Sequence, residues 1–163
     1  MNIEGMRVLT AADSAEVTEL VAGIYAEYPG CVLDLPGVDD DLPALADRLQ
    51  SLGGQGWAVQ DGTDLVACVG WAPHGHGTAE LKRLYVASGA RGRGLGAGLV
   101  GHITAVAAEA GVRWLELWSD TRFTDAHRLY ERCGFTRLPE SRDLHDPSHT
   151  TEFHYLRDLD SSG

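Results

Sequence analysis

The stretch "ARGRGLGAGL", residues 90–99, holds four glycines, two arginines and no acidic residue, in a chain that is otherwise acidic. Glycine loses more conformational freedom on folding than any other residue, so four glycines in ten positions indicate a specific use. A strand-like segment, "TAELKRLYV" (78–86), precedes the stretch, and apolar residues at helical spacing follow it from Leu95 to Val106, with a stop at Gly111. The glycine segment is therefore predicted to join a strand to the start of a helix.

The start of a helix is a natural place for an anion. Its first backbone N–H groups have no partner inside the helix, and the helix dipole places partial positive charge there. Missing side chains at Gly92, Gly94 and Gly96 would let those N–H groups approach a ligand closely, and Arg91 and Arg93 add full charges. These residues predict a pyrophosphate site. A solvated turn in front of a helix is the alternative interpretation.

The glycine pattern alone leaves the identity of the phosphate ligand open. A Walker loop is excluded because no Gly-Lys-Ser/Thr follows, whereas Gly92, Gly94 and Ala97 fit the Gly-x-Gly-x-x-Ala pattern of a dinucleotide site. However, the preceding strand carries Glu80 and a basic pair at 82–83, where a central parallel strand would be nearly all apolar. An NAD(P)-binding oxidoreductase stays an alternative at this point.

The rest of the chain has the pattern of an α/β domain. Periodicity and turn residues predict, around the glycine segment, a short strand near residue 6, helices with apolar repeats at 17–24 and 42–49, a hairpin of 56–60 and 65–71, the strand 78–86, a helix from 95, a strand at 112–118, a helix at 124–135, and final strands at 135–144 and 150–159. The order βααβββαβαββ predicts a mixed α/β sheet in a single domain, residues 1–163.

Charge and composition restrict the partners. The net charge of −11 and the isoelectric point of about 4.9 argue against nucleic acid or an anionic membrane as partner. The three cysteines are far apart and form no CxxC motif, which favours free thiols in a reducing compartment, and no segment is long and apolar enough to span a bilayer. We therefore expect a cytoplasmic protein. No metal site is expected, because the histidines and cysteines show no ligand spacing.

A second set of residues narrows the function. The succession "AELKRLYV", "ARGRGLGAGL", a helix, "WLELW" and "AHRLYERCGF" resembles the Gcn5-related N-acetyltransferase (GNAT) family over residues 79–135. Arg91, Gly94 and Gly96 match the family's loop pattern R/Q-x-x-G-x-G/A. Its pattern A-x-x-L-Y-E-x-x-G-F is met by Ala126, Leu129, Tyr130, Glu131, Gly134 and Phe135.

The resemblance implies a fold and a cosubstrate. The expected fold is α/β (α+β), with a mixed, mostly antiparallel sheet flanked by helices and splayed to form a cofactor cleft. The expected cosubstrate is acetyl-CoA, with its pyrophosphate on the amides of residues 91–96 and its pantetheine on the backbone of residues 84–86. The cofactor-binding residues so implied are Leu84, Tyr85, Val86, Arg91, Gly92, Arg93, Gly94, Leu95, Gly96, Ala97 and Ala126. Partners in the family are often copies of the same chain, so a homodimer is possible.

Acetyl transfer to a primary amine requires a neutral nucleophile, a polarised carbonyl and a protonated leaving thiolate. An alkylamine with a pKa of about 10.4 must lose a proton, at a cost of about 4 to 5 kcal/mol at pH 7, so a base should assist. Glu80 is the first candidate for this base and Asp120 the second. Tyr130 occupies the position of the family's general acid. The structural alternative for Glu80 is an exposed charge on the sheet, and that for Asp120 is a cap of the turn. For Tyr130 the alternative is a tyrosine packed in the core.

The acceptor is expected to touch the loop 28–41 and the two N-terminal helices. In the loop, Asp34 and the acids of residues 39–41 would permit a cationic group. Phe123 stands where the family often has an asparagine, so that side chain can pack on the cofactor but not hydrogen-bond to it. Trp118 is expected in the core, with a place in the lining of the acceptor pocket as the alternative. His74 and His76 flank a glycine in a loop and could relay protons, although a solvated loop position is favoured. A non-catalytic CoA-binding sensor is the remaining alternative function.

Overall fold

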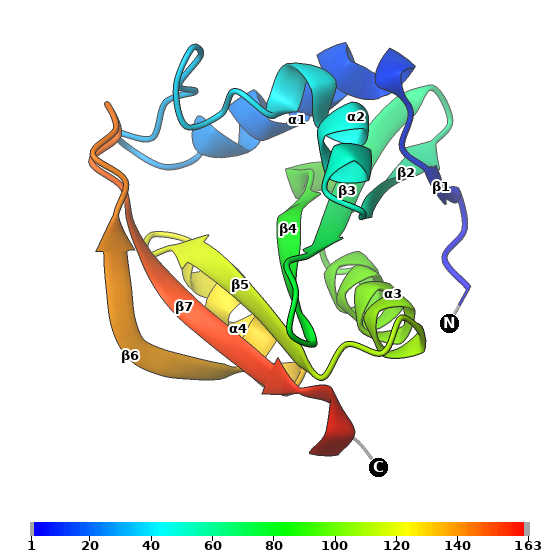
Figure 1. Ribbon diagram of the computed structural model, residues 1–163. Helices are drawn as coiled ribbons and strands as arrows, with labels where there is room; N and C mark the ends of the chain where they lie inside the picture. Colours follow the sequence, from blue (N-terminus) through cyan, green and yellow to red (C-terminus); the bar gives the residue numbers. More distant parts are fainter. Residues whose placement is uncertain (1, 162–163) are drawn as a thin grey trace.

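A single seven-stranded sheet runs through the protein (Figure 1), whose computed structural model describes residues 2–161. The strands are β1 (Met6–Val8), β2 (Gln55–Asp61), β3 (Asp64–Pro73), β4 (Thr78–Val86), β5 (Trp114–Asp120), β6 (Thr136–Asp143) and β7 (Thr151–Asp158). Their order across the sheet is β1-β2-β3-β4-β5-β7-β6, and only the β4–β5 pair is parallel. The predicted mixed, mostly antiparallel sheet is confirmed. The parallel, doubly wound sheet of a dinucleotide-binding oxidoreductase is excluded.

Helices cover both faces of the first half of this sheet. Helices α1 (Ser14–Tyr25) and α2 (Leu45–Ser51) lie on one face, while α3 (Leu95–Glu109) and α4 (Thr124–Arg132) lie on the other (Figure 1). Each helix buries an apolar stripe, so two hydrophobic clusters form, one on each face. In the described part of the chain, α1 and α2 do not extend over β5, β7 and β6 (Figure 1). One face of those strands is therefore left without a helical cover.

The alternation of β5 follows from this one-sided cover. Leu115 and Leu117 point toward α3 and α4 and are fully buried. The alternate residues Glu116 and Trp118 point to the uncovered face and are half-buried. The favoured expectation that Trp118 lies in the core is wrong, because within residues 2–161 the aliphatic residues of the strand occupy the face of β5 that helices cover. The uncovered face leaves Trp118 to line a pocket, as the alternative expectation had it.

The sheet opens between β4 and β5. The two strands pair from Thr78 with Trp114 to Glu80 with Glu116, and no further. On the other side of β4, Cys68 pairs with Tyr85 whereas Gly70 pairs with Lys82, so two residues of β4 face one residue of β3. This β-bulge includes Arg83, whose φ of +53° lies in the left-handed region, and a bulge bends its strand. The bend turns the end of β4 away from β5 and makes the predicted splayed sheet.

The described residues also agree with two compositional expectations. Cys31, Cys68 and Cys133 are free thiols, as their spacing predicted. Among the helices of residues 2–161, none has the length and the apolar character that crossing a bilayer would require.

Candidate active site

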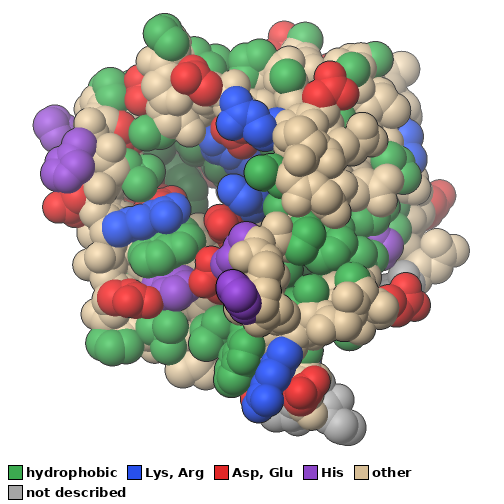
Figure 2. All heavy atoms as spheres, viewed as in Figure 1, with side chains coloured by type: hydrophobic (Ala, Val, Ile, Leu, Met, Phe, Trp, Pro, Cys, Tyr) green, Lys and Arg blue, Asp and Glu red, His purple; other side chains and the backbone are tan. Residues whose placement is uncertain are grey.

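A cleft of about 570 Å³ lies where β4 and β5 separate. Residues 80–85 of β4 form one wall and residues 117–120 of β5 the other, and Tyr130 of α4 contributes to the lining. Figure 2 shows this cleft as a hollow in the face that looks toward the viewer, with Lys and Arg side chains around it. The hollow is a direct consequence of the end of pairing at Glu80, because beyond that residue no backbone bonds hold the two strands together.

Two loops join across one end of the cleft. The backbone N–H of Val32, in the loop after α1, donates to Ser148 Oγ at 2.8 Å, and Ser148 Oγ donates back to Val32 O at 3.1 Å. Arg122, in the turn after β5, donates to Ser148 O at 3.1 Å. The two loops thus bound the cleft beyond the free ends of β4 and β5, and Figure 1 shows them meeting above β6 and β7.

The glycine segment lies between β4 and α3, as predicted. Gly92 and Gly94 have φ angles of +80° and +77°, and a Cβ at either position would meet no atom within 4 Å. Glycine is therefore required there by the backbone, and the space above it is open. Helix α3 begins after Gly94 without a side-chain cap, so its first N–H groups stay available. At Gly96 the absence of a side chain serves packing. A Cβ there would lie 2.9 Å from Leu129 Cδ2 of α4, so this glycine lets α3 and α4 pack closely.

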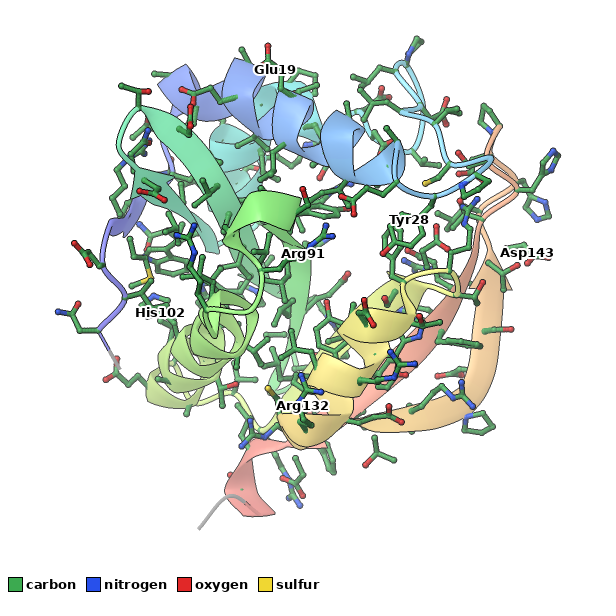
Figure 3. All side chains as sticks on the ribbon, turned by 180° about the vertical axis from the view of Figure 1, so that it is seen from behind. Glu19, Tyr28, Arg91, His102, Arg132 and Asp143 are labelled. Atoms are coloured by element: carbon green, nitrogen blue, oxygen red, sulfur yellow. The ribbon has the colours of Figure 1, made fainter. Side chains whose placement is uncertain are left out.

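Both arginines of the segment are paired with acids. The Arg91 guanidinium binds Glu27 through two hydrogen bonds of 2.6 and 2.9 Å, and its Nε donates to Val86 O at 3.1 Å. Arg93 binds Asp61 at 3.1 Å, and both pairs are substantially exposed. Figure 3, seen from behind, shows Arg91 and Tyr28 between α1 above and the helices α3 and α4 below. The positive charge of the segment thus lies on the rear side of the sheet.

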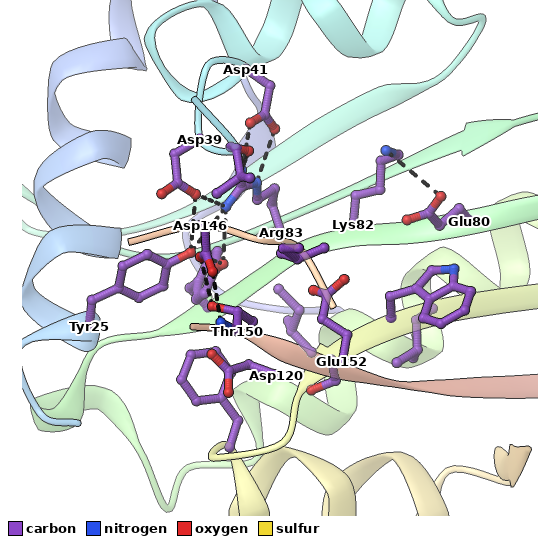
Figure 4. A pocket seen from close by; sticks show the side chains of 18 of the residues that line it. Tyr25, Asp39, Asp41, Glu80, Lys82, Arg83, Asp120, Asp146, Thr150 and Glu152 are labelled. Atoms are coloured by element: carbon purple, nitrogen blue, oxygen red, sulfur yellow. Dashed lines mark hydrogen bonds and ion pairs between the residues drawn. The ribbon is translucent and has the colours of Figure 1, made fainter. Parts of the chain in front are cut away.

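Arg83 lies just upstream of the glycine segment but does not contribute its charge to it. Its largely buried guanidinium donates to Asp41 at 3.0 and 2.5 Å and to Asp39 at 3.0 Å. The hydroxyl groups of Tyr25 and Tyr85 lie at 3.4 and 3.3 Å from the same guanidinium (Figure 4). Arg83 therefore engages both Asp39 and Asp41, although its single positive charge offsets only one of the two carboxylates. That the acids of this loop permit a cationic acceptor stays a prediction.

Glu80 lies on the cleft wall, as the first candidate base should. Glu80 is the last residue of β4 that pairs with β5, and its carboxyl group is half-buried. Burial raises the pKa of this carboxyl, Lys82 Nζ at 3.8 Å from Oε1 opposes the rise, and the carboxylate of Glu116 adds to it. A carboxylate whose pKa is raised is a stronger base at neutral pH than an ordinary one.

Asp120 also lines the cleft, but its carboxylate is engaged. Arg122 binds it through Nε and Nη2, at 2.8 Å for the shorter contact, and through its backbone N–H at 2.9 Å. These bonds hold the turn that leads into α4. They favour Glu80 over Asp120 as the group that accepts a proton.

Tyr130 reaches the cleft from α4. The ring is buried against Phe135 and Tyr155, with centroids at 6.0 and 5.9 Å. Burial raises the pKa of its hydroxyl, so the group keeps its proton at physiological pH. Within residues 2–161 the hydroxyl has no hydrogen-bond partner, although it belongs to a residue that lines the cleft. It is therefore a protonated group that is free to donate.

Two aromatic residues complete the lining. Phe123, at the start of α4, packs against Tyr28 at 4.8 Å and Tyr25 at 6.2 Å between ring centroids. Trp118 stacks on His154 at 4.1 Å, and the Arg142 guanidinium lies 4.1 Å from the centre of its ring. The cleft walls therefore combine flat apolar surface with a few charged groups, which is typical of small-molecule sites.

Sequence reasoning named His74 as a residue that could relay protons, but it did not place Glu116 or His154 at the site near Glu80. Glu116 Oε1 lies 2.9 Å from His74 Nε2, so His74 is not simply a solvated loop histidine. Glu116 Oε2 lies 3.0 Å from Nε2 of the buried His154. Only strand register brings these residues together; alternation along "RWLELW" could have placed Glu116 on the side of Glu80, but no spacing could have paired it with either histidine.

Comparison with known proteins agrees with this geometry. Residues 21–135 match the model of the acetyltransferase (GNAT) family. A GNAT-family acetyltransferase from Staphylococcus aureus Mu50 has a TM-score of 0.79 and 19% identity, over 94% of this chain and 98% of that one. For yncA of Salmonella typhimurium, solved with its cofactor acetyl-CoA, the TM-score is 0.74 and the identity 18%, over 97% and 95% of the two chains.

A third solved structure, the ribosomal-protein-alanine N-acetyltransferase of Brucella melitensis, has a TM-score of 0.71 and 18% identity, over 94% of this chain and 98% of that one. At these identities the solved structures show the same fold. Among curated proteins no relative matches. Since the family model spans most of the sequence and the sheet opens toward the end of β4, just before the glycine segment, the chain belongs to the acetyltransferase (GNAT) family.

Proposed function

We propose that the protein is an N-acetyltransferase that moves an acetyl group from acetyl-CoA to a primary amine, by direct attack in a ternary complex. One observation carries the proposal: a raised-pKa carboxyl, Glu80, and an unpartnered protonated hydroxyl, Tyr130, line the same cleft in the opened sheet. These are a base for the incoming amine and an acid for the leaving thiol. Asp120 is the reserve candidate for the base.

The residues present fit acetyl-CoA. Beyond Glu80 the β4 backbone has no strand beside it on the β5 side, so Leu84, Tyr85 and Val86 offer peptide groups to the pantetheine amides. The open space over Gly92 and Gly94 and the uncapped start of α3 suit the pyrophosphate. The remaining residues proposed to hold the cosubstrate are Arg91, Arg93, Leu95, Gly96, Ala97 and Ala126.

The ion pairs of Arg91 and Arg93 do not oppose this proposal. Both pairs are exposed, and exposed ion pairs contribute only about 0 to 1 kcal/mol. Either guanidinium can therefore exchange its carboxylate for a phosphate at little cost. The presence of acetyl-CoA in the yncA structure supports the same cosubstrate here.

When bound, acetyl-CoA supplies an acetyl thioester. Glu80 takes a proton from the acceptor's ammonium group, which frees the nitrogen lone pair. A backbone N–H near Leu84 or Tyr85 polarises the thioester carbonyl. The freed nitrogen forms a bond to the carbonyl carbon, the carbon–sulfur bond breaks, and Tyr130 donates its hydroxyl proton to the departing sulfur. The second proton of the acetylated nitrogen returns the Tyr130 phenolate to its protonated form. Phe123 and Trp118 supply flat surface that excludes water from the reacting groups.

Direct transfer is favoured over an acetyl-cysteine intermediate. Cys31 lines the cleft, but burial raises the pKa of its thiol to about 11, and burial raises that of Cys68 to about 12. The thiolate is the nucleophilic form of cysteine, and neither residue populates it near neutral pH. The acceptor class is a small-molecule or peptide amine. The acidic charge, the free thiols and the family also support the proposals of no nucleic-acid or membrane partner, a cytoplasmic location and a possible homodimer.

Calorimetry with CoA, acetyl-CoA and NADPH, followed by a thiol-release assay with a panel of amines, tests the proposal. We expect heat with CoA and acetyl-CoA, none with NADPH, and amine-dependent release of CoA thiol. Absence of heat with both CoA forms at millimolar ligand would overturn the whole account. Binding without thiol release for any amine would instead support the CoA-sensor alternative.

A further inference from the structure

Glu80 does not stand alone at the point where the sheet opens. Because Glu80 and Glu116 are register partners on parallel strands, their side chains lie on the same face. One carboxylate oxygen of each residue and one ring nitrogen of His74 all lie within 4.8 Å of one another. One ordered water bridges a gap of this size with good hydrogen bonds. The three groups are therefore close enough to exchange a proton.

From Glu116 the contacts lead in two directions. Oε1 contacts Nε2 of His74, at 2.9 Å, and the His74 side chain is 44% exposed. Oε2 contacts Nε2 of His154, at 3.0 Å, and that ring is only 10% exposed, stacked on Trp118 and bonded on its other side to Glu140. His74 therefore connects Glu116 to bulk water, whereas His154 holds Glu116 in place.

A recessed base needs such a connection. Glu80 gains one proton in each cycle and must lose it before the next, and its raised pKa slows that loss. The cleft that Glu80 faces is also the place where acceptor and product would lie, so that route to water is obstructed during turnover. A second route on the side away from the cleft would restore the base independently of product release.

We propose that Glu116 and His74 form a proton relay that carries the proton from Glu80 to solvent, with His154 and Glu140 as positioning residues for Glu116. The inference rests on the proposed function. An N–H bond of the acceptor's ammonium breaks, its electron pair stays on nitrogen, and the proton goes to Glu80. One proton then passes through water to Glu116, one from Glu116 Oε1 to His74 Nε2, and one from the exposed imidazolium to bulk water.

The charges around the relay are consistent with this direction. Glu80 is faced by Lys82 on its own strand, by Glu116 from β5, by Arg142 from β6 and by His74 from the loop before β4. Lys82 and Arg142 favour the ionised form of Glu80, so they promote loss of its proton. Glu116 opposes ionisation of Glu80 while it is itself charged, which keeps Glu80 basic before each turnover.

Buffer rescue tests the relay. In His74→Ala, at saturating substrates and with a chelator present to remove adventitious metal, we expect kcat to fall about 10-fold and to recover as imidazole is added. Wild type and His76→Asn, a control in the same loop, should not respond to imidazole. Asparagine tolerates the left-handed backbone of position 76, where φ is +53°. Glu116→Gln should lose a similar factor without rescue, because imidazole cannot replace the half-buried carboxylate that stands between Glu80 and His74.

A wild-type kcat in His74→Ala, or a loss that imidazole leaves unchanged, would overturn the relay. A second measurement needs no turnover: the ring resonances of His74 are followed against pH in the free protein. We expect an inflection from Glu80 that disappears in Glu80→Gln, and its absence in wild type would also overturn the inference. If wild type acetylates no amine, the proposed function fails, while the ring titration still decides whether the groups are coupled.

Discussion

Glu80 and Glu116 form the last residue pair that joins β4 to β5, so two carboxyl groups lie side by side where the sheet opens. Before this pair the backbone hydrogen bonds are made between the strands. After it, the edge of β4 is free, and the cleft begins. The end of strand pairing thus opens the space for a cosubstrate and also places the candidate base at the edge of that space.

Replacing Tyr130 by phenylalanine should lower kcat by about 10- to 1,000-fold with acetyl-CoA saturating, because the protonated hydroxyl would no longer supply a proton to the leaving sulfur. The fold should be unaffected, since the hydroxyl makes no hydrogen bond to any of residues 2–161. Steady-state kinetics and urea unfolding of both proteins measure these two effects. An unchanged kcat would remove Tyr130 from the mechanism.

Replacing Glu80 by glutamine should lower kcat/KM most on the acidic side of the pH range. In wild type, activity should fall as pH drops through the raised pKa of Glu80, because the base becomes protonated. In Glu80→Gln the reaction depends on amine that is already neutral, so kcat/KM should rise about tenfold per pH unit toward the amine pKa of about 10.4. The ratio of wild type to variant should therefore shrink with rising pH; a constant ratio would refute the assignment.

Two glycine-to-alanine changes should shift stability in opposite directions. At Gly94, φ is +77° and no atom lies within 4 Å of an added methyl group, so alanine adds only backbone strain and should destabilise by about 1 kcal/mol. At Gly101, inside α3 and equally free of contacts, alanine should stabilise by about 0.5 to 1 kcal/mol. Urea unfolding gives both values. Equal signs would mean that the left-handed backbone at position 94 is not maintained.

Affinity for CoA separates the same two glycine variants. Gly94→Ala should also weaken CoA binding several-fold in calorimetry, because the left-handed backbone orients the N–H groups at the start of α3. Gly101→Ala, which lies more than a helical turn farther along α3, should bind as wild type does.

Two arginine variants should separate structural from binding charge. Arg83→Met should destabilise the protein by about 3 kcal/mol, since it leaves the buried carboxylate of Asp39 without its counter-ion. Arg93→Met removes only an exposed pair with Asp61 and should cost less than about 1 kcal/mol. CoA affinity should behave in the opposite way, because Arg93 and not Arg83 lies in the glycine segment. Wild-type stability in Arg83→Met would contradict the structural role of the cluster.

The features that could be predicted from the sequence are those that depend on residues close together in the chain. Left-handed backbone needs glycine at 92 and 94, helical spacing defines α3, and the strand-to-helix junction between them follows. Glu80 and Tyr130 could be named as candidates because the resemblance to the family rests on short stretches of sequence. The sequence did not show that both residues line one cleft. The ion pairs of Asp39 and Asp41 could not be predicted for the converse reason: their partner, Arg83, lies more than 40 residues away.

The amino-acid order by itself determined the succession of strands and helices, the uncapped start of α3 and the family, because periodicity, glycine conformation and short motifs act over a few residues. The tertiary structure alone decided which charges meet. Arg83 reaches Asp39 and Asp41 through a bulge, and Glu116 reaches His74 and His154 through strand register. The reason is physical: a hydrogen bond depends on ångström-scale positions, which only the packed sheet fixes for residues distant in the chain.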